Sequence, residues 1–395
     1  MNITLPKQTE SIEQLPVQET EPMNDDASLE PVQSIAEKKP SIADVTKGEL
    51  GEVLKRIAKN KPDLVTKANS IPHIKRLPFG MFELDYATRG GIPYNRITMF
   101  WGIESSGKST TTYLLIRMSQ KLYPHKFQAY IDAESTFDPS WAEAYGVDLD
   151  RLLVIRPESG EQASEVLEAM IKTLEIDLIV VDSLPALLPM REMERDMETA
   201  EVGGNALLVR RMTTKTVAFL ANEQLRGHDV AVVFINQVRL KIGQLHGNPE
   251  TMPCGQAPKF YSSLIIKFYA KDVVEKAIHP EKPAYRDTIA TITKSKVLIN
   301  SKKTDYKIAM IDNGVQGLGE TDSFNAVNGY LKNFGFVEKV KEGYALYEDG
   351  LDQEPTIYEK VGDIKDLYQT DKMFANKLHS LVANFDGVKA TYVGS

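Results

Sequence analysis

The feature that most constrains this chain is the run from Gly102 to Ser109, Gly-Ile-Glu-Ser-Ser-Gly-Lys-Ser. Two glycines five residues apart, followed by Lys and Ser, match the phosphate-loop pattern. The mostly apolar residues 96–101 predict a strand before it, and residues 110–118 predict a helix after it. A strand–loop–helix unit aims backbone N–H groups at a bound anion. We therefore expect a nucleoside triphosphate site, with Lys108 on the terminal phosphates and Ser109 on Mg²⁺.

Composition and charge set broader limits. The 395 residues, 42% hydrophobic and 26% charged, are enough for a large globular core. The net charge is −8, and residues 1–40 hold eight acidic residues against three lysines, which predicts a disordered acidic tail. The rest of the chain is therefore close to neutral, so local basic grooves can exist. One cysteine and the lack of a signal core or long apolar run favour a cytoplasmic protein with no membrane partner.

Residues 41–72 are expected to form an N-terminal helix followed by a linker. Leu50, Val53, Leu54 and Ile57 recur at the spacing of one apolar stripe on a helix. A single short helix cannot hide such a stripe by itself. It must therefore pack on the main domain or on another subunit.

Residues 73–316 alternate short apolar runs with longer stretches of helical spacing. The run 178–181 is apolar on both faces, which is typical of a parallel strand covered by helices. This alternation predicts a mostly parallel, doubly wound α/β sheet, and three closely spaced strands at its end predict an antiparallel extension. A small α+β domain is expected over residues 317–395. The strands are predicted at residues 96–101, 128–132, 152–156, 177–182, 230–236, 263–269, 287–293 and 306–311.

Polar residues follow three of these strands, where parallel sheets bind ligands. Asp182 ends one strand and could hold Mg²⁺ opposite Ser109, although Asp182 and Ser183 could equally cap a helix. Glu134 follows another and could polarise an attacking water. Gln237 ends a third, where its amide could sense a γ-phosphate or simply cap the strand.

Two long stretches, residues 190–205 and 237–255, are punctuated by glycine or proline and carry several charges. They are too long for idle connections. Loops with a few cations and apolar side chains suit a flexible strand of nucleic acid. From composition alone, a disordered lid is the simpler interpretation.

Taken together, these motifs resemble the RecA family of ATP-dependent recombinases. The resemblance runs from about residue 78 to 261 and less clearly to 344. Its most specific element is Asn-Pro-Glu-Thr at residues 248–251, inside a loop. The other matching segments are residues 102–110, 131–134, 137–139, 177–187, 234–241 and 259–261.

The resemblance implies a RecA-type P-loop ATPase core that forms a helical filament on single-stranded DNA. Such a filament pairs that strand with homologous duplex DNA and exchanges strands, with ATP and Mg²⁺ held between subunits. The helix within residues 41–72 then packs on the next subunit. Single-strand-binding protein and loading mediators are further implied partners. The implied ATP-binding residues are Gly102, Ile103, Glu104, Ser105, Ser106, Gly107, Lys108, Ser109 and Thr110, with Asp138 and Trp141 at the adenine.

The resemblance also implies catalytic and DNA-binding roles. Glu134 becomes the base that activates water, Gln237 the γ-phosphate sensor, and Ser109 and Asp182 the Mg²⁺ ligands. Lys294 and Lys296 reach a neighbour's ATP; without the family, they would be two solvated lysines at a strand end. The implied DNA contacts are Arg211, Arg239, Lys241, Ile242 and Asn248.

Three departures from the family pattern favour a divergent member, such as a phage-encoded one. Residues 190–205 keep little of the usual sequence, and the usual acidic C-terminal tail is missing. His246 and Cys254 stand where an aromatic residue and a glycine are more typical. Two other functions remain open: a ring-forming helicase, against which residues 248–251 and the N-terminal helix argue, and a non-catalytic regulatory paralogue, against which Lys108 and Glu134 argue.

Overall fold

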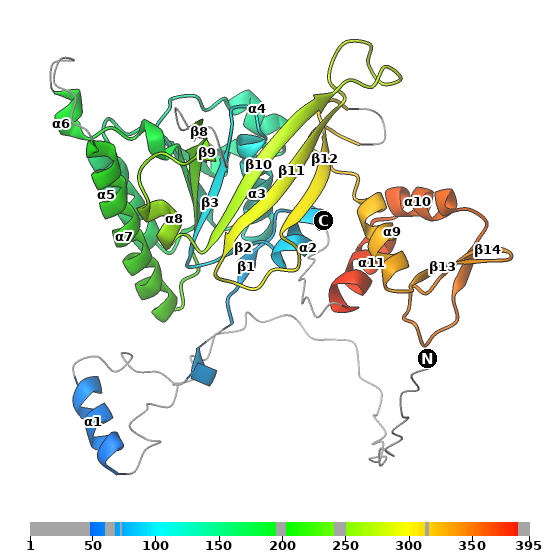
Figure 1. Cartoon of the computed structure of the whole chain (residues 1–395), viewed down its shortest axis with the longest axis horizontal. Helices are drawn as coiled ribbons and strands as arrows, with labels where there is room; N and C mark the ends of the chain where they lie inside the picture. Colours follow the sequence, from blue (N-terminus) through cyan, green and yellow to red (C-terminus); the bar gives the residue numbers. More distant parts are fainter. Residues whose placement is uncertain are drawn as a thin grey trace, which may run out of the picture. The chain divides into compact units, whose positions relative to one another are not determined.

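The computed structural model describes residues 48–59, 68–71, 73–194, 203–240, 250–312 and 316–385. The chain divides into two units, Met1–Ile71 and Pro72–Ser395, which we treat separately (Figure 1). The expected acidic tail, residues 1–40, lies outside the described residues. Within the described ranges, no helix has both the length and the apolar character needed to span a membrane.

The first unit contains the expected helix, α1 (Glu49–Ala58). Glu49 and Glu52 lie in its first turn and basic residues in its last, which complements the helix dipole. Val53 and Ile57 of the apolar stripe are 37% and 40% exposed. The stripe is therefore available to a partner surface. A short 3-10 turn, Ala68–Ser70, falls in the stretch expected to be a linker.

The second unit is built on an eight-stranded sheet with the strand order β12-β11-β10-β3-β7-β6-β4-β5. Strands β10, β3, β7, β6, β4 and β5 are parallel, and β11 runs antiparallel to both β10 and β12. The doubly wound sheet and its antiparallel extension are thus confirmed. The bounds are β3 (Ile97–Gly102), β4 (Phe127–Asp132), β5 (Leu152–Ile155), β6 (Ile176–Asp182), β7 (Ala231–Gln237), β10 (Leu264–Val273), β11 (Tyr285–Ser295) and β12 (Lys303–Ala309).

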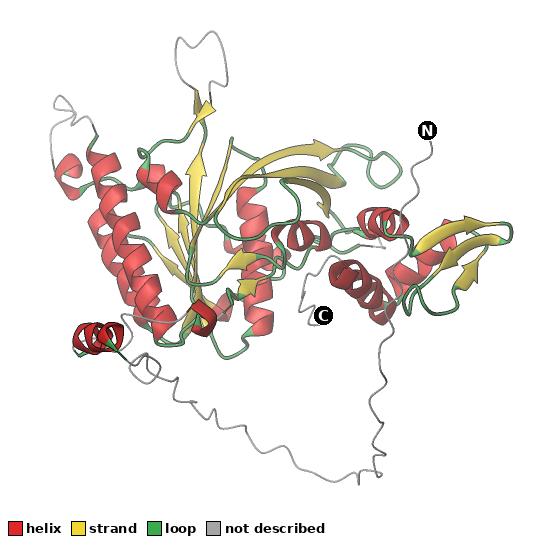
Figure 2. Cartoon of the chain, turned by 60° about the horizontal axis from the view of Figure 1, so that its bottom comes forward, coloured by secondary structure: helices red, strands yellow, loops and turns green. Residues whose placement is uncertain are grey.

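Helices cover both faces of this sheet (Figure 2). On one face lies α3 (Lys108–Leu122), and on the other lie α5 (Gly160–Lys172) and α7 (Gly204–Leu225). The strands send alternate side chains to the two sides. Phe100 belongs to the apolar cluster around α3, whereas Met99 and Trp101 belong to the cluster around α5 and α7. This two-sided burial explains the uninterrupted apolar run at residues 178–181.

Several predicted bounds were wrong. Strands β10 and β11 extend beyond residues 263–269 and 287–293, and β12 begins three residues before the predicted 306 and ends at Ala309 rather than at 311. In this extension, cross-strand pairing such as the Arg286–Asp272 ion pair (2.7 Å) replaces apolar burial, so hydrophobicity does not mark the ends. The two-residue strands β1 (Arg76–Leu77) and β2 (Ile92–Pro93) were not predicted at all.

The predicted loop at 190–205 is shorter than expected at both ends. A helical turn, α6 (Met190–Met193), occupies its start, and α7 begins at Gly204. Within the stretch at 237–255, β8 (Arg239–Leu240) and β9 (Glu250–Thr251) pair as a small antiparallel sheet. Residues 195–202 and 241–249, between these elements, lie outside the described residues.

The C-terminal part has its own sheet and apolar cluster. Its three strands pair antiparallel, and cluster members Phe324, Leu346 and Leu378 are buried. Phe82 and Tyr86, from α2 (Phe82–Thr88) of the sheet region, belong to the same cluster. The elements are α9 (Phe324–Asn333), β13 (Val337–Val340), β14 (Gly343–Leu346), β15 (Thr356–Tyr358), α10 (Val361–Thr370) and α11 (Lys372–Phe385).

Glu83 lies buried where α2 meets this C-terminal part, and the Ser323 hydroxyl donates a 2.7 Å hydrogen bond to it. Burial raises the pKa of Glu83 from 4.5 to about 7; the Ser323 bond opposes the shift, and the charges of Asp322 and Asp305 add to it. The protonated carboxyl therefore contributes stability that is complete below pH 4.5 and is lost as the pH rises through about 7. This contribution to the free energy of unfolding is on the order of 3 kcal/mol.

We expect Glu83→Gln to raise the thermal unfolding midpoint relative to the parent chain at pH 8. At pH 5 the gain should disappear, because Glu83 is then protonated and resembles the amide. Thermal unfolding at both pH values measures this, with the exposed Glu338→Gln as the matched control. An equal shift for Glu83→Gln at both pH values would contradict the prediction.

Candidate functional site

The strand register brings the predicted site residues to one edge of the sheet. Gly102 at the end of β3 lies opposite Gln237 at the end of β7, and Asp132 of β4 lies opposite Asp182 of β6. All four are at the carboxyl ends of parallel strands, where open α/β sheets bind their ligands. The glycine loop begins directly after Gly102, so the polar strand ends surround it.

Both glycines of the phosphate-loop pattern, Gly102 and Gly107, are needed, for different reasons. A Cβ on Gly102 would come within 2.4 Å of the Ser106 hydroxyl and 2.5 Å of the Phe268 carbonyl oxygen. Gly107 has φ 90°, in the left-handed region, and forms the N-cap of α3. The backbone can therefore fold closely around an anion, which is the cradle a triphosphate requires.

Lys108 points back over this loop. Its ammonium donates hydrogen bonds to the carbonyl oxygen of Ile103 (2.7 Å) and to the Ser106 hydroxyl (3.3 Å). Burial lowers the pKa of Lys108, and the nearby charges of Asp182 and Glu134 oppose this shift. The cation thus lies between the loop and the acidic strand ends.

The remaining loop residues divide by exposure. Ile103, Glu104, Ser105 and Ser109 are exposed, and Ser109 stands in the first turn of α3. Thr110 is buried. The exposed residues are those that a ligand on the loop could reach.

Two acidic side chains form the opposite wall. The Tyr130 hydroxyl donates a short hydrogen bond to Asp182, and burial raises the pKa of Asp182 to about 6, with Glu134 among the groups that raise it further. Glu134 accepts a short hydrogen bond from the Ser183 hydroxyl and a 2.8 Å hydrogen bond from Nε2 of Gln237. The side chains that follow three separate strands are therefore joined in one network.

These hydrogen bonds bear on the two capping alternatives that the sequence left open. Ser183 precedes a 3-10 turn, Leu184–Ala186, but its side chain makes no capping hydrogen bond there. Instead the Ser183 hydroxyl donates a hydrogen bond to Glu134, and the Asp182 carboxylate accepts one from the Tyr130 hydroxyl. Neither Asp182 nor Ser183 therefore serves as the helix cap. Likewise Gln237 reaches across to Glu134 rather than capping its own strand.

Sequence reasoning gave no site role to Tyr130 or Asp132, which shape the site, and considered Ser183 only as a possible helix cap. Asp132 is buried and accepts the backbone N–H groups of Thr136 and Phe137, both at 3.1 Å. It thereby holds the turn that carries Glu134. A carboxylate two residues before a predicted base was a usable signal, but nothing in the spacing pointed to Tyr130.

Asp138 and Trp141 lie at a short helix, α4 (Pro139–Ala144). Asp138 caps it by accepting the backbone N–H of Ser140 at 2.9 Å. Trp141 is 40% exposed, and its ring centroid lies 5.5 Å from that of Tyr145. Trp141 therefore presents an aromatic surface, while Asp138 has a structural task of its own.

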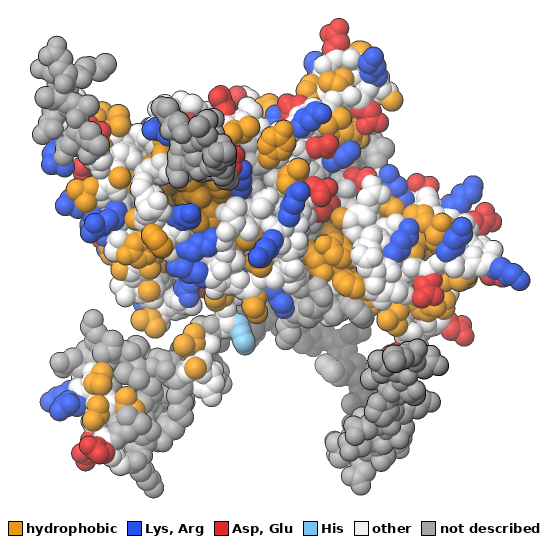
Figure 3. All heavy atoms as spheres, in the orientation of Figure 1, with side chains coloured by type: hydrophobic (Ala, Val, Ile, Leu, Met, Phe, Trp, Pro, Cys, Tyr) orange, Lys and Arg blue, Asp and Glu red, His pale blue; other side chains and the backbone are white. Residues whose placement is uncertain are grey.

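Lys294 and Lys296 lie away from the chain's own glycine loop. Lys294 pairs with Ile265, which pairs with Met99, three residues and roughly 10 Å before Gly102 along β3. Both ammonium groups donate 2.8 Å hydrogen bonds to the Phe260 carbonyl at the end of α8 (Ala257–Tyr261). Both ammonium groups are therefore held at α8, although Lys296 remains exposed. Figure 3 shows Lys and Arg side chains gathered over α8 and the neighbouring strands.

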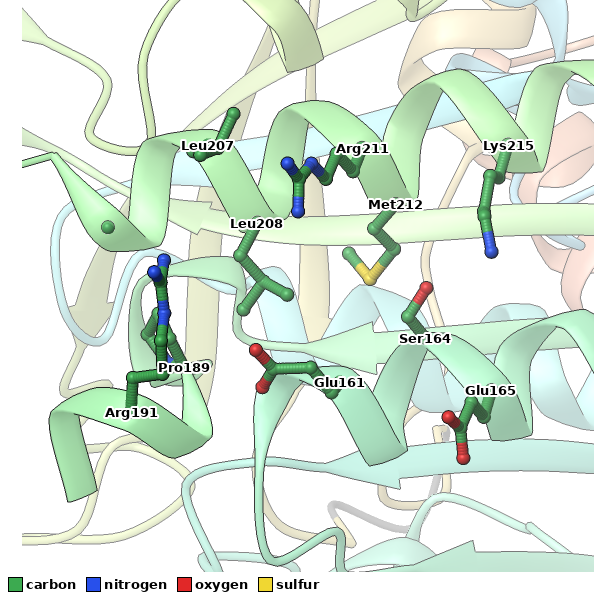
Figure 4. Close-up of a pocket in the computed structure, with 11 residues that line it drawn as sticks. Glu161, Ser164, Glu165, Pro189, Arg191, Leu207, Leu208, Arg211, Met212 and Lys215 are labelled. Carbon is green, nitrogen blue, oxygen red and sulfur yellow. The ribbon is translucent and has the colours of Figure 1, made fainter. Parts of the chain in front are cut away.

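The predicted DNA contacts are only partly described. Arg239 is exposed on β8. Arg211 is exposed on α7, where it lines a groove of about 180 Å³ against α5 and α6. Figure 4 shows Arg191, Arg211 and Lys215 around this groove together with the carboxylates of Glu161 and Glu165, so its charge is mixed. Lys241, Ile242 and Asn248 lie outside the described residues.

The site also fits a divalent cation held together with phosphates. In the ranges that the structure covers, no group of three or more His, Cys, Asp or Glu side chains is arranged to hold a metal by itself. Mg²⁺ usually takes one or two protein oxygens and completes its shell with water and substrate phosphates. The Ser109 hydroxyl and the Asp182 carboxylate supply oxygens of that kind.

Comparison with known proteins agrees with this geometry. Residues 49–316 match the family model of the RecA N-terminal domain. A protein named Protein RecA from Heliobacterium modesticaldum is 36% identical over 71% of this chain and 76% of its own length. The proteins of the same name from Thioalkalivibrio sulfidiphilus and Lactobacillus acidophilus are each 32% identical, over 72% and 83% of this chain and 80% and 90% of their own lengths. The chain therefore belongs to the RecA family of ATP-hydrolysing DNA recombinases.

Proposed function

We propose that this chain polymerises on single-stranded DNA as a helical filament, pairs that strand with homologous duplex DNA and exchanges strands. The observation that carries the proposal is the 2.8 Å hydrogen bond from Gln237 to Glu134. It joins the strand that leads into β8 and β9 to the carboxylate beside the glycine loop. ATP turnover with and without single-stranded DNA, imaged in parallel for filaments, tests the proposal. The proposal would be overturned if single-stranded DNA did not change the rate of ATP turnover, or if the images showed closed rings instead of filaments.

Within one subunit, the proposed roles follow from what each side chain can reach. Glu134 accepts the proton of the attacking water, and its present donors, Ser183 and Gln237, orient its carboxylate. Gln237 senses the γ-phosphate by hydrogen bonding, which would compete with its bond to Glu134. Lys108 exchanges its loop carbonyl partners for phosphate oxygens. Mg²⁺, bound through Ser109 and Asp182, would supply charge neutralisation at those phosphates.

The site is completed by a second subunit in this proposal. Lys294 and Lys296 sit on a different part of the sheet from their own loop and would reach a neighbour's ATP, as an arginine finger does. The exposed stripe of α1 supplies a surface for the same assembly. ATP bound between subunits then stabilises the DNA-gripping filament, and hydrolysis releases it.

The other assignments are proposed with these. Residues 73–316 form the RecA-like ATPase core with its DNA-binding loops, residues 41–72 serve subunit packing, residues 317–395 form a small α+β domain, and residues 1–40 form an acidic tail. Asp138 and Trp141 contact adenine; Arg211 and Arg239 contact DNA. Lys241, Ile242 and Asn248 are proposed DNA contacts on resemblance alone. We place the protein in the cytoplasm, with single-strand-binding protein and loading mediators as partners.

Glu134→Gln should lower ATP turnover at least about 100-fold, because the base is removed while the shape is kept. Binding of a fluorescent ATP analogue should persist, so the variant accumulates in its DNA-bound, ATP-loaded form. Lys108→Ala should instead weaken analogue binding and abolish nucleotide-dependent filaments. Glu143→Gln, an exposed glutamate on α4, is the matched control for phosphate-release assays. If the Glu134→Gln variant hydrolysed ATP within a few fold of the parent rate, Glu134 would not be the catalytic base.

The double variant that carries both Lys294→Ala and Lys296→Ala should also lack ATP turnover by itself. Mixed with Glu134→Gln, it should recover DNA-dependent turnover, because one interface then combines an intact loop and base with the partner's intact lysines. Phosphate release by the mixture measures this, and the exposed Lys302→Ala serves as the control change. A mixture no more active than its two inactive parents would show that the lysines do not act across the interface.

A further inference from the structure

Three side chains in register form a platform on the α8 side of the sheet. Lys267 of β10 pairs with Trp101 of β3, and Trp101 pairs with Asn236 of β7. Trp101 directly precedes Gly102, where the glycine loop begins, and Asn236 directly precedes Gln237. The platform is therefore one residue away from both ends of the nucleotide network.

The chain segment 250–254, which returns to the sheet from residues outside the described ranges, is held over this platform. Lys267 makes a short ion pair with Glu250 of β9. Asn236 donates a 3.4 Å hydrogen bond from Nδ2 to the Pro253 carbonyl. Trp101 lines a cavity of about 310 Å³ together with Glu250. The return segment thus contacts two of the platform side chains, Lys267 and Asn236, and shares a cavity with the third, Trp101.

Lys267 joins the two parts electrostatically. Its ammonium lies 5.2 Å from the centroid of the Trp101 ring while it pairs with Glu250. The Lys267 and Glu250 side chains are only 27% and 24% exposed, and Trp101 is 6% exposed. Partial burial strengthens both a cation–π contact and an ion pair compared with contacts in open solvent. Moving either partner would disturb the other through the same ammonium group.

We propose that Lys267 is a positioning residue that couples the nucleotide loop at Gly102 to the return segment at Glu250. A shift of Trp101 when nucleotide fills the loop would change the position of Lys267, and Glu250 would follow. Coupling of this kind is reciprocal, so DNA on the connection that leads into the return segment would also change the affinity for ATP. The inference rests on the proposed function, in which the connection between β8 and β9 meets DNA.

The test is Lys267→Met, which keeps the length of the side chain and removes its charge. The concentration of an oligo-dT strand that gives half-maximal stimulation of ATP turnover should rise roughly fivefold or more, the range of typical coupling energies. The KM for ATP without DNA should change much less. Lys267→Arg should restore most of the coupling, and Lys271→Met, an exposed lysine on the same strand, should have no effect.

A spectroscopic readout separates coupling from a loss of stability. The chain has two tryptophans, so Trp141→Phe leaves Trp101 as the sole one. In that background, oligo-dT should change the fluorescence emission of Trp101 when residue 267 is Lys. The emission should stay nearly unchanged in the Lys267→Met variant. The two proteins should have equal thermal unfolding midpoints. If the parent chain shows DNA-stimulated turnover and Lys267→Met keeps both the stimulation and the emission change, this inference is wrong. If DNA does not stimulate ATP turnover even in the parent chain, the proposed function itself is wrong.

Discussion

The arrangement of the site depends on the parallel register between β3 and β7. Because Gly102 pairs with Gln237, the start of the glycine loop and the amide that reaches Glu134 stand side by side. The register is held by side chains alternately buried on both faces of β3, Phe100 toward α3 and Met99 toward α5 and α7. A slip of one residue would turn each of these side chains to the opposite face. Core packing therefore fixes the chemistry at the sheet edge.

Much of this could be predicted from the sequence because the signals were local. The glycine loop, the apolar runs of the parallel strands and the polar residues that end them each lie within a few consecutive positions. What escaped prediction depends on contacts between distant segments. Tyr130 lies inside a strand, and only the pairing of β4 with β6 brings it to Asp182. The ends of β10 and β11 are set by cross-strand pairs such as Arg286 with Asp272, which no hydrophobic pattern reveals.

One departure from the family pattern has a clear structural setting. Cys254 stands where glycine is more typical, and its φ is 68°, in the left-handed region that favours glycine. The residue is 6% exposed, and burial raises the pKa of its thiol to about 12. It therefore behaves as a small apolar side chain under backbone strain, at the end of the segment 250–254 that Lys267 and Asn236 hold.

The shared aromatic cluster of α2 and the C-terminal part has a consequence for how the chain can be cut. Phe82 and Tyr86 belong to the sheet region in sequence, yet their rings pack against Tyr330, with centroids 6.1 and 4.3 Å apart. Removing everything after residue 316, where the family match ends, would leave these rings facing water. Exposed aromatic surface of that kind promotes aggregation. Residue 316 is thus where the domain model ends but not where the packed unit ends, because the aromatic cluster shared with α2 extends through α11.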